Sequence, residues 1–145
     1  MPDKSKRSLG IIAVIEILIA IGIISFWAAF FSTGMVSIKD PQLKETYLAF
    51  ESAFPLPDGW LVISLITGGI GLLKKKKYGY FFSLIGGSSL IFLGLVDISF
   101  NVRQGIYVLG AGEAILNISI NLICLISGIF ILSIMRGCER SEAGS

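Results

Sequence analysis

Long apolar stretches alternate with short charged segments along the chain. A helix needs about 20 residues to cross the roughly 30 Å hydrocarbon core of a bilayer, and three of the four apolar stretches reach that length. A backbone in lipid must satisfy its own hydrogen bonds, so each stretch should be a helix. The pattern therefore predicts an all-α membrane protein, an antiparallel four-helix transmembrane bundle, with spans of about 9–31, 59–73, 78–100 and 106–135.

The connection between the first two spans is much longer than the others. Between residues 42 and 54 its apolar side chains recur at spacings of three and four, which predicts a short amphipathic helix in the outer headgroup layer. Its apolar face would consist of Leu43, Tyr47, Phe50 and Phe54. We expect Pro55 and Pro57 to stop this helix and Asp58 to cap the start of the next one.

Composition supports the membrane assignment. Hydrophobic residues make up 54% of the chain and the mean hydropathy is +0.83, well above what a soluble domain of this size shows. The four spans and their joints occupy nearly all of the 145 residues, so we expect residues 1–145 to form a single membrane domain.

The distribution of basic residues predicts the orientation. Short loops rich in Lys and Arg stay in the cytoplasm, so we expect a multi-pass protein of the cell inner (plasma) membrane with both termini cytoplasmic. This rule also accounts for the lysine run at 74–77, and we expect no nucleic-acid partner. The inner flanks carry Lys4, Lys6, Arg7, Lys74, Lys75, Lys76, Lys77, Arg136 and Arg140, and the outer segments carry Lys39, Lys44 and Arg103.

Metal and redox chemistry have little support in the sequence. Histidine, the usual nitrogen ligand of haem, zinc and copper, does not occur. Cys124 lies within the fourth span, Cys138 lies beyond it, and no C-x-x-C motif is present. We therefore expect no cofactor and no metal.

Small residues follow one face of the third span. Helices in lipid associate where their backbones approach closely, so this face predicts tight helix packing, with a groove for a lipid or ligand tail as the alternative. Association with a second copy or with another membrane protein is a further expectation. At about 100° per residue the face comprises Gly79, Ser83, Gly86, Leu90, Gly94 and Asp97.

Three acidic residues, Glu16, Asp97 and Glu113, lie inside or at the edge of apolar stretches. An ionised carboxylate there costs several kcal/mol unless it is paired or hydrated, which makes these residues functional candidates. Glu113 shares an arc of about 80° on the fourth span with Asn117 and Asn121. We expect Asp97, Glu113, Asn117 and Asn121 to bound a polar ligand-binding pocket, with Glu16 as a further ligand-binding candidate. The alternative is interhelical hydrogen bonding alone, worth about 0.6–2 kcal/mol per contact.

Asp97 and Glu113 both lie near the predicted outer surface and could form a catalytic carboxylate pair. Asp97 stands four residues before Asn101, however, on the same helical face, and Arg103 follows within the same turn. We therefore expect Asp97 to pair with Asn101 or Arg103, and Glu113 to turn toward Asn117.

Parts of the chain resemble three known groups of membrane proteins. FPLPDGW at 54–60, LVDISFN at 95–101 and GIY at 105–107 resemble segments of small uncharacterised prokaryotic four-span membrane proteins, which implies no activity. Glu16 in the first span is similar to the carboxylate with which small multidrug-resistance exporters exchange protons for cationic drugs. The layout of Asp97 and Glu113 is similar to that of lipoprotein signal peptidases, although the Asn and Arg that accompany that family's first Asp are absent here.

Three functions remain open at this point. The first is the binding or transport of a small or amphipathic ligand, which includes membrane lipid, through the polar intramembrane pocket. The second is a non-catalytic assembly or accessory subunit of a membrane complex. The third is an intramembrane hydrolase that uses Asp97 and Glu113.

Overall fold

The chain folds into helices throughout its described part, which confirms the predicted all-α class. The structure, a computed structural model, describes residues 3–34 and 38–143, and for residues 3–6, 113 and 138–143 the backbone alone. Within these ranges, every α-helix except the second is long and apolar enough to span a membrane, which gives four candidate spans. The helices are α1 (Asp3–Thr33), α2 (Pro41–Glu51), α3 (Pro55–Leu73), α4 (Lys77–Gln104) and α5 (Ala111–Ala143).

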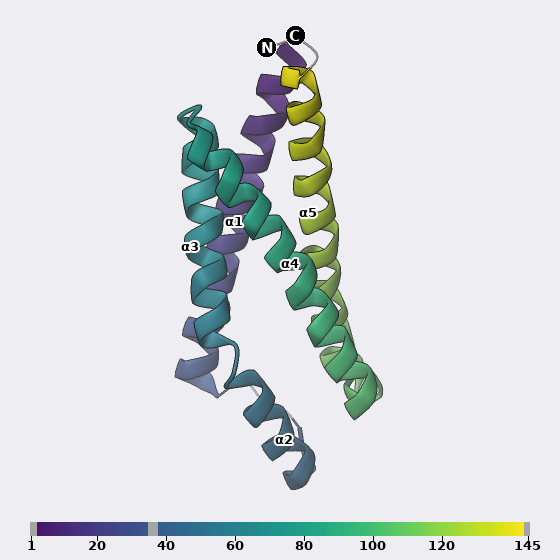
Figure 1. Cartoon of the computed structure of the whole chain (residues 1–145). Coiled ribbons are helices and arrows are strands. Elements are labelled where there is room, and N and C mark those ends of the chain that lie inside the picture. Colours follow the sequence, from purple (N-terminus) through teal and green to yellow (C-terminus); the bar gives the residue numbers. More distant parts are fainter. Residues whose placement is uncertain (1–2, 35–37, 144–145) are drawn as a thin grey trace.

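The long helices pack side by side and alternate in direction along the chain (Figure 1). Extensive contacts join α1 to α3, α3 to α4, and α4 to α5, whereas α1 and α5 touch at few points. Helix α4 crosses the bundle obliquely (Figure 1). The bundle therefore has a termini end, where α1 begins and α5 ends, and an opposite end where α2 lies, here called the α2 end.

The small-residue face of α4 packs as predicted. Gly79, Ser83, Gly86, Leu90 and Gly94 are all buried. Near the start of α4, Gly79 lies directly against Gly71 of α3, and near its other end Gly94 lies against Cys124 and Leu125 of α5. These contacts follow the oblique path of α4 from one neighbour to the other.

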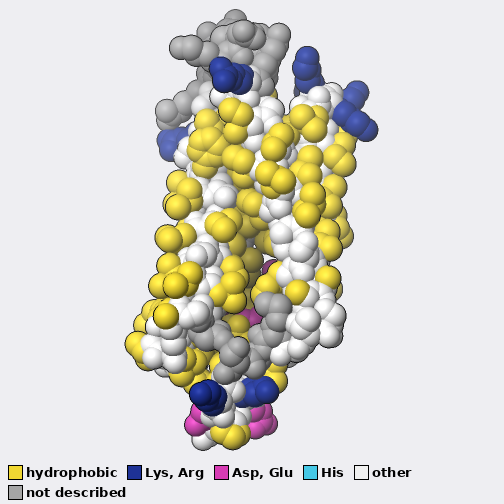
Figure 2. Space-filling view, turned by 180° about the vertical axis from the view of Figure 1, so that it is seen from behind, with side chains coloured by type: hydrophobic (Ala, Val, Ile, Leu, Met, Phe, Trp, Pro, Cys, Tyr) yellow, Lys and Arg dark blue, Asp and Glu magenta, His cyan; other side chains and the backbone are white. Residues whose placement is uncertain are grey.

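The apolar side chains divide between an interior core and an exposed surface. Ile12, Leu72, Ile131 and Met135 are among the buried residues of the core and lie toward the termini end. Many large apolar side chains remain exposed, and they cover much of the bundle surface seen in Figure 2. Such a surface is unfavourable in water and is expected for helices that face lipid.

The predicted boundary between α2 and the second span is wrong. Helix α2 ends at Glu51, and α3 begins at Pro55, with Phe54 as its N-cap residue. Pro55 and Pro57 therefore start a helix rather than stop one, because proline fits the first helical turn, where its missing N–H has no helical partner. Asp58 lies within that first turn and does not cap it.

The predicted start of the fourth span at residue 106 is also wrong, because α5 begins at Ala111. Gly105 adopts a left-handed conformation with φ of 67°, and its N–H closes the end of α4 on the carbonyls of Asn101 and Val102. Glycine reaches this region without the strain that a side chain would add. A short 3-10 helix, Ile106–Val108, then buries Ile106 before α5 starts.

Candidate functional site

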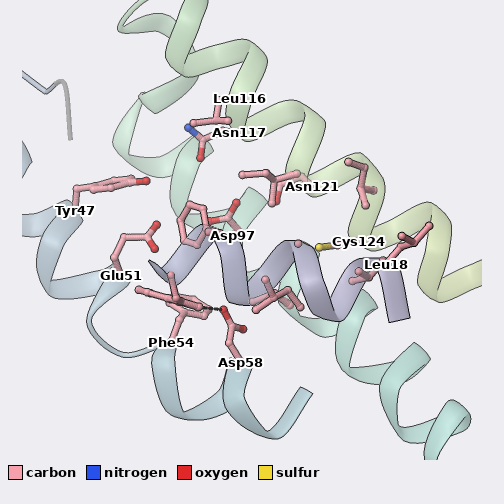
Figure 3. A pocket seen from close by; sticks show the side chains of 18 residues that line it. Leu18, Tyr47, Glu51, Phe54, Asp58, Asp97, Leu116, Asn117, Asn121 and Cys124 are labelled. Atoms are coloured by element: carbon pink, nitrogen blue, oxygen red, sulfur yellow. Dashed lines mark hydrogen bonds between the residues drawn. The ribbon is translucent and has the colours of Figure 1, made fainter. Parts of the chain in front are cut away.

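A cavity opens between the helices at the α2 end of the bundle (Figure 3). Its volume is about 460 Å³, which is within the range of about 300–1,000 Å³ found for small-molecule sites. Residues from α1, α2, α3, α4 and α5 line it, so the whole bundle shapes it. They are Leu18, Ile19, Gly22, Ile23, Phe26, Trp27, Tyr47, Glu51, Phe54, Asp58, Leu93, Asp97, Leu116, Asn117, Ile120, Asn121, Ile123 and Cys124.

Most of the cavity wall is apolar. Helix α1 contributes Leu18, Ile23 and Phe26, and α5 contributes Ile120 and Ile123. These two helices touch at few points, so the space between them is left open rather than filled by side chains. Such a wall suits an aliphatic or aromatic group.

Three carboxylates from three different helices give the cavity a polar end. Glu51 comes from α2, Asp58 from α3 and Asp97 from α4. Glu51 and Asp58 are only 8% and 7% exposed. The pKa of Glu51 is raised to about 7, mainly by burial; a hydrogen bond with Tyr47 opposes this rise, and the charges of Asp97 and Asp58 add to it. The three acidic side chains therefore lie close enough to repel one another.

Asp58 joins two helices through its side chain. The indole Nε1 of Trp27 on α1 donates a hydrogen bond of 2.8 Å to Asp58 Oδ2 on α3 (dashed in Figure 3). The expected role of Asp58 as a helix cap is replaced by this contact, because an aromatic N–H at the same depth needs an acceptor in a water-poor environment.

Asp97 belongs to a chain of side-chain hydrogen bonds between α4 and α5. The amide Nδ2 of Asn101 donates to Asp97 Oδ2 at 3.1 Å and to Asn117 Oδ1 at 3.3 Å. The predicted pairing of Asp97 with Asn101 is confirmed. Asn121 Nδ2 donates to the hydroxyl of Tyr107 at 2.9 Å, so the amides of α5 are held by residues at and after the end of α4.

Helix α2 closes the cavity at its own end of the bundle. The ring of Phe50 stacks on Phe100 of α4, with 3.7 Å between the ring centroids and planes 2° apart. Tyr47 of α2 and Phe54, the N-cap residue of α3, both line the cavity. The apolar face of the predicted amphipathic helix is thus directed toward the bundle.

The five candidate residues predicted from the sequence fall in different places. Asp97, Asn117 and Asn121 line the cavity. Glu16 is buried elsewhere, where α1 meets α3 and α4, and its Oε2 and Ser83 Oγ occupy the space that a side chain at Gly68 would need. The side chain of Glu113 lies outside the described residues, so its turn toward Asn117 stays a prediction, and its pairing with Asp97 stays the alternative to it.

Three residues at the site were not found from the sequence: Trp27, Glu51 and Asp58. A signal existed for Glu51, which follows Tyr47 by four residues and precedes Phe54 by three, and therefore shares the apolar face of the helix predicted at 42–54. An acidic side chain buried on an otherwise apolar face is a functional candidate, as it is within a membrane span. No comparable signal marked Trp27 or Asp58.

Comparison with known proteins identifies a family whose function is unknown. A family model described as "Domain of unknown function (DUF8058)" matches residues 6–144. No curated protein and no solved structure matches the chain.

Proposed function

The chain belongs to the DUF8058 family, whose function is unknown, and we propose that this small polytopic membrane protein binds a small amphipathic ligand in the cavity at the α2 end. The observation that carries the proposal is the division of the cavity wall. One region is lined by aliphatic and aromatic side chains, and the other by carboxylates and amides. A ligand with an apolar body and a polar head group would satisfy both regions.

The open side of the cavity supports entry from the membrane. Figure 2 shows the molecule hollowed toward the α2 end, with Asp or Glu side chains visible inside the hollow. A ligand dissolved in the bilayer would reach such a hollow laterally. Buried core residues such as Ile12, Leu72 and Met135 occupy the termini end, which favours a binding site over a continuous pore.

Tryptophan fluorescence offers a direct test, because the two tryptophans of the chain differ in position. Trp27 lines the cavity, whereas Trp60 is 53% exposed and does not. In the Trp60→Phe variant, reconstituted in phosphatidylcholine nanodiscs, we would titrate a brominated dodecyl amphiphile and follow quenching of Trp27. If the amphiphile binds in the cavity, quenching of Trp27 should saturate as the amphiphile concentration rises. In the Trp27→Phe variant, quenching of Trp60 should rise in proportion to the amount partitioned.

A matched pair of glycine variants separates the cavity from the surrounding lipid. Gly22 lines the cavity, and nothing lies within 4 Å of a Cβ added there, so Gly22→Leu should fill the space without a clash at the backbone. Gly10 on the same helix has the same free space but is not part of the cavity lining. Saturable quenching should be lost in Gly22→Leu and kept in Gly10→Leu. If quenching of Trp27 never saturates, or survives Gly22→Leu unchanged, the proposed function is refuted.

A further inference from the structure

The acidic end of the cavity specifies the head group of the ligand. Building on the proposed function, we infer that the ligand is an amphipathic organic cation, with an ammonium or similar group held by Glu51, Asp58 and Asp97 and no phosphate attached to it.

The charges that line the cavity are all negative. Among the described residues, 18 line the cavity; three of these are acidic and none is Lys or Arg. Buried carboxylates are normally paired with a cation or with hydrogen-bond donors. Asp58 accepts a hydrogen bond from Trp27, and Asp97 accepts hydrogen bonds from Asn101 and Asn121, but all of these donors are neutral. A cationic ligand would supply the charge that the lining residues lack.

The cavity wall also holds an acceptor without a donor. Asn121 is 3% exposed and lines the same cavity. Its Nδ2 donates to the hydroxyl of Tyr107, whereas its Oδ1 is buried and has no hydrogen-bond partner among the described residues. Figure 3 shows Asn121 on the wall next to Asp97. An ammonium group carries donors only, so it fits a site that offers carboxylate oxygens and a free amide oxygen.

The same geometry disfavours an anionic or zwitterionic phospholipid. A phosphate placed among Glu51, Asp58 and Asp97 would meet acidic side chains, and the described lining residues include no basic side chain to offset its charge. With the cationic group at the acidic end, the apolar wall of α1 and α5 would hold a single hydrocarbon chain or aromatic group of the ligand. A long-chain amine or a membrane-soluble organic cation meets both conditions.

The experiment compares amphiphiles that differ only in the head group. Using quenching of Trp27 in the Trp60→Phe protein, we would titrate brominated dodecyl chains that carry a trimethylammonium, a maltoside or a phosphate. The cation should bind at least about tenfold more tightly than the maltoside, and the phosphate should show no saturable binding. The trimethylammonium charge is fixed, so any effect of pH on binding belongs to the protein.

Variants at the acidic end separate charge from shape. Glu51→Gln and Asp97→Asn should each weaken cation binding about tenfold and weaken maltoside binding by a smaller factor, because only the cation loses a charge–charge attraction. Glu45→Gln, on the same helix as Glu51 but exposed and outside the cavity lining, is the matched control. Cation affinity should also rise between about pH 6 and about pH 8, because Glu51 ionises in this range. The other titratable groups that line the cavity with Glu51 are Asp58, Asp97, Tyr47 and Cys124. Glu51→Gln should flatten the rise in affinity.

The outcomes distinguish this inference from the proposed function. If the maltoside saturates as tightly as the cation, the inference is wrong and the amphipathic site remains. If the phosphate binds best, the inference is likewise wrong. If no amphiphile saturates, both the inference and the proposed function are refuted.

Discussion

Replacing Gly128 with alanine tests how closely α4 and α5 approach each other. A Cβ added at Gly128 would lie 2.7 Å from the carbonyl oxygen of Gly87 and 2.7 Å from Ile91 Cγ1. The first of these contacts is with backbone, which cannot rotate away as a side chain can. The two helices must therefore separate to admit the methyl group.

The expected change in the free energy of unfolding follows from two opposing effects of Gly128→Ala. Alanine stabilises a helix interior by about 1 kcal/mol relative to glycine. Overpacking a filled interior costs about 1–3 kcal/mol, and a backbone contact should place Gly128→Ala at the upper end of that range. We therefore expect a net loss of about 2 kcal/mol, or roughly 4–8 °C in Tm if the scaling found for chains of this size in water holds in detergent.

The control lies on the same helix. No atom of the described residues lies within 4 Å of a Cβ added at Gly137, so Gly137→Ala should leave Tm unchanged or raise it slightly. Both variants would be measured by thermal unfolding in the same detergent, with loss of the monodisperse peak in size-exclusion chromatography as the readout. A Gly128→Ala protein as stable as Gly137→Ala would mean that α4 and α5 do not meet at Gly128.

Three further predictions concern the site and the topology. Trp27→Phe removes the donor to Asp58 and should lower the free energy of unfolding by about 1–3 kcal/mol, measured by thermal unfolding against Trp60→Phe, whose indole is exposed. Glu51 should make the free energy of unfolding fall as pH rises from about 4.5 to about 7, because its carboxyl ionises in the unfolded chain while it keeps its proton in the folded one. Glu51→Gln should remove this contribution, and an identical dependence on pH in both proteins would contradict the prediction. The basic inner flanks predict that a cysteine introduced at Lys75 is protected from an impermeant thiol reagent in intact cells, whereas one at Lys44 reacts, and the reverse labelling would show that the sides are exchanged.

Hydropathy and helical spacing were sufficient for the features that depend on local pattern. The four spans follow from the lengths of the apolar stretches, and the buried face of α4 follows from the spacing of Gly79, Ser83 and Gly86. The hydrogen bond between Asn101 and Asp97 follows from their separation of four residues on one helix.

Features that depend on tertiary contacts could not be predicted in the same way. Asp58 has the local sequence of a helix cap, and its partner Trp27 lies 31 residues earlier in the chain. Residues 106–108 are as apolar as the span that follows them, so hydropathy could not show that Gly105 and a 3-10 turn precede α5. Glu51 became part of the site only because Phe50 docks α2 on Phe100.

The position of the cavity at one end of the bundle has a consequence for how the sequence of this protein can evolve. Core residues such as Ile12, Leu72 and Met135 hold the termini end together, whereas the cavity is lined at the other end by residues such as Leu18 and Ile123. Some cavity residues also serve stability, because Cys124 belongs to the buried core and Ile19, Ile23, Leu93 and Ile120 pack against it. Lining positions outside that cluster, such as Leu18, Gly22 and Ile123, can vary at a lower cost in stability, so the same scaffold is able to acquire new specificities there one residue at a time.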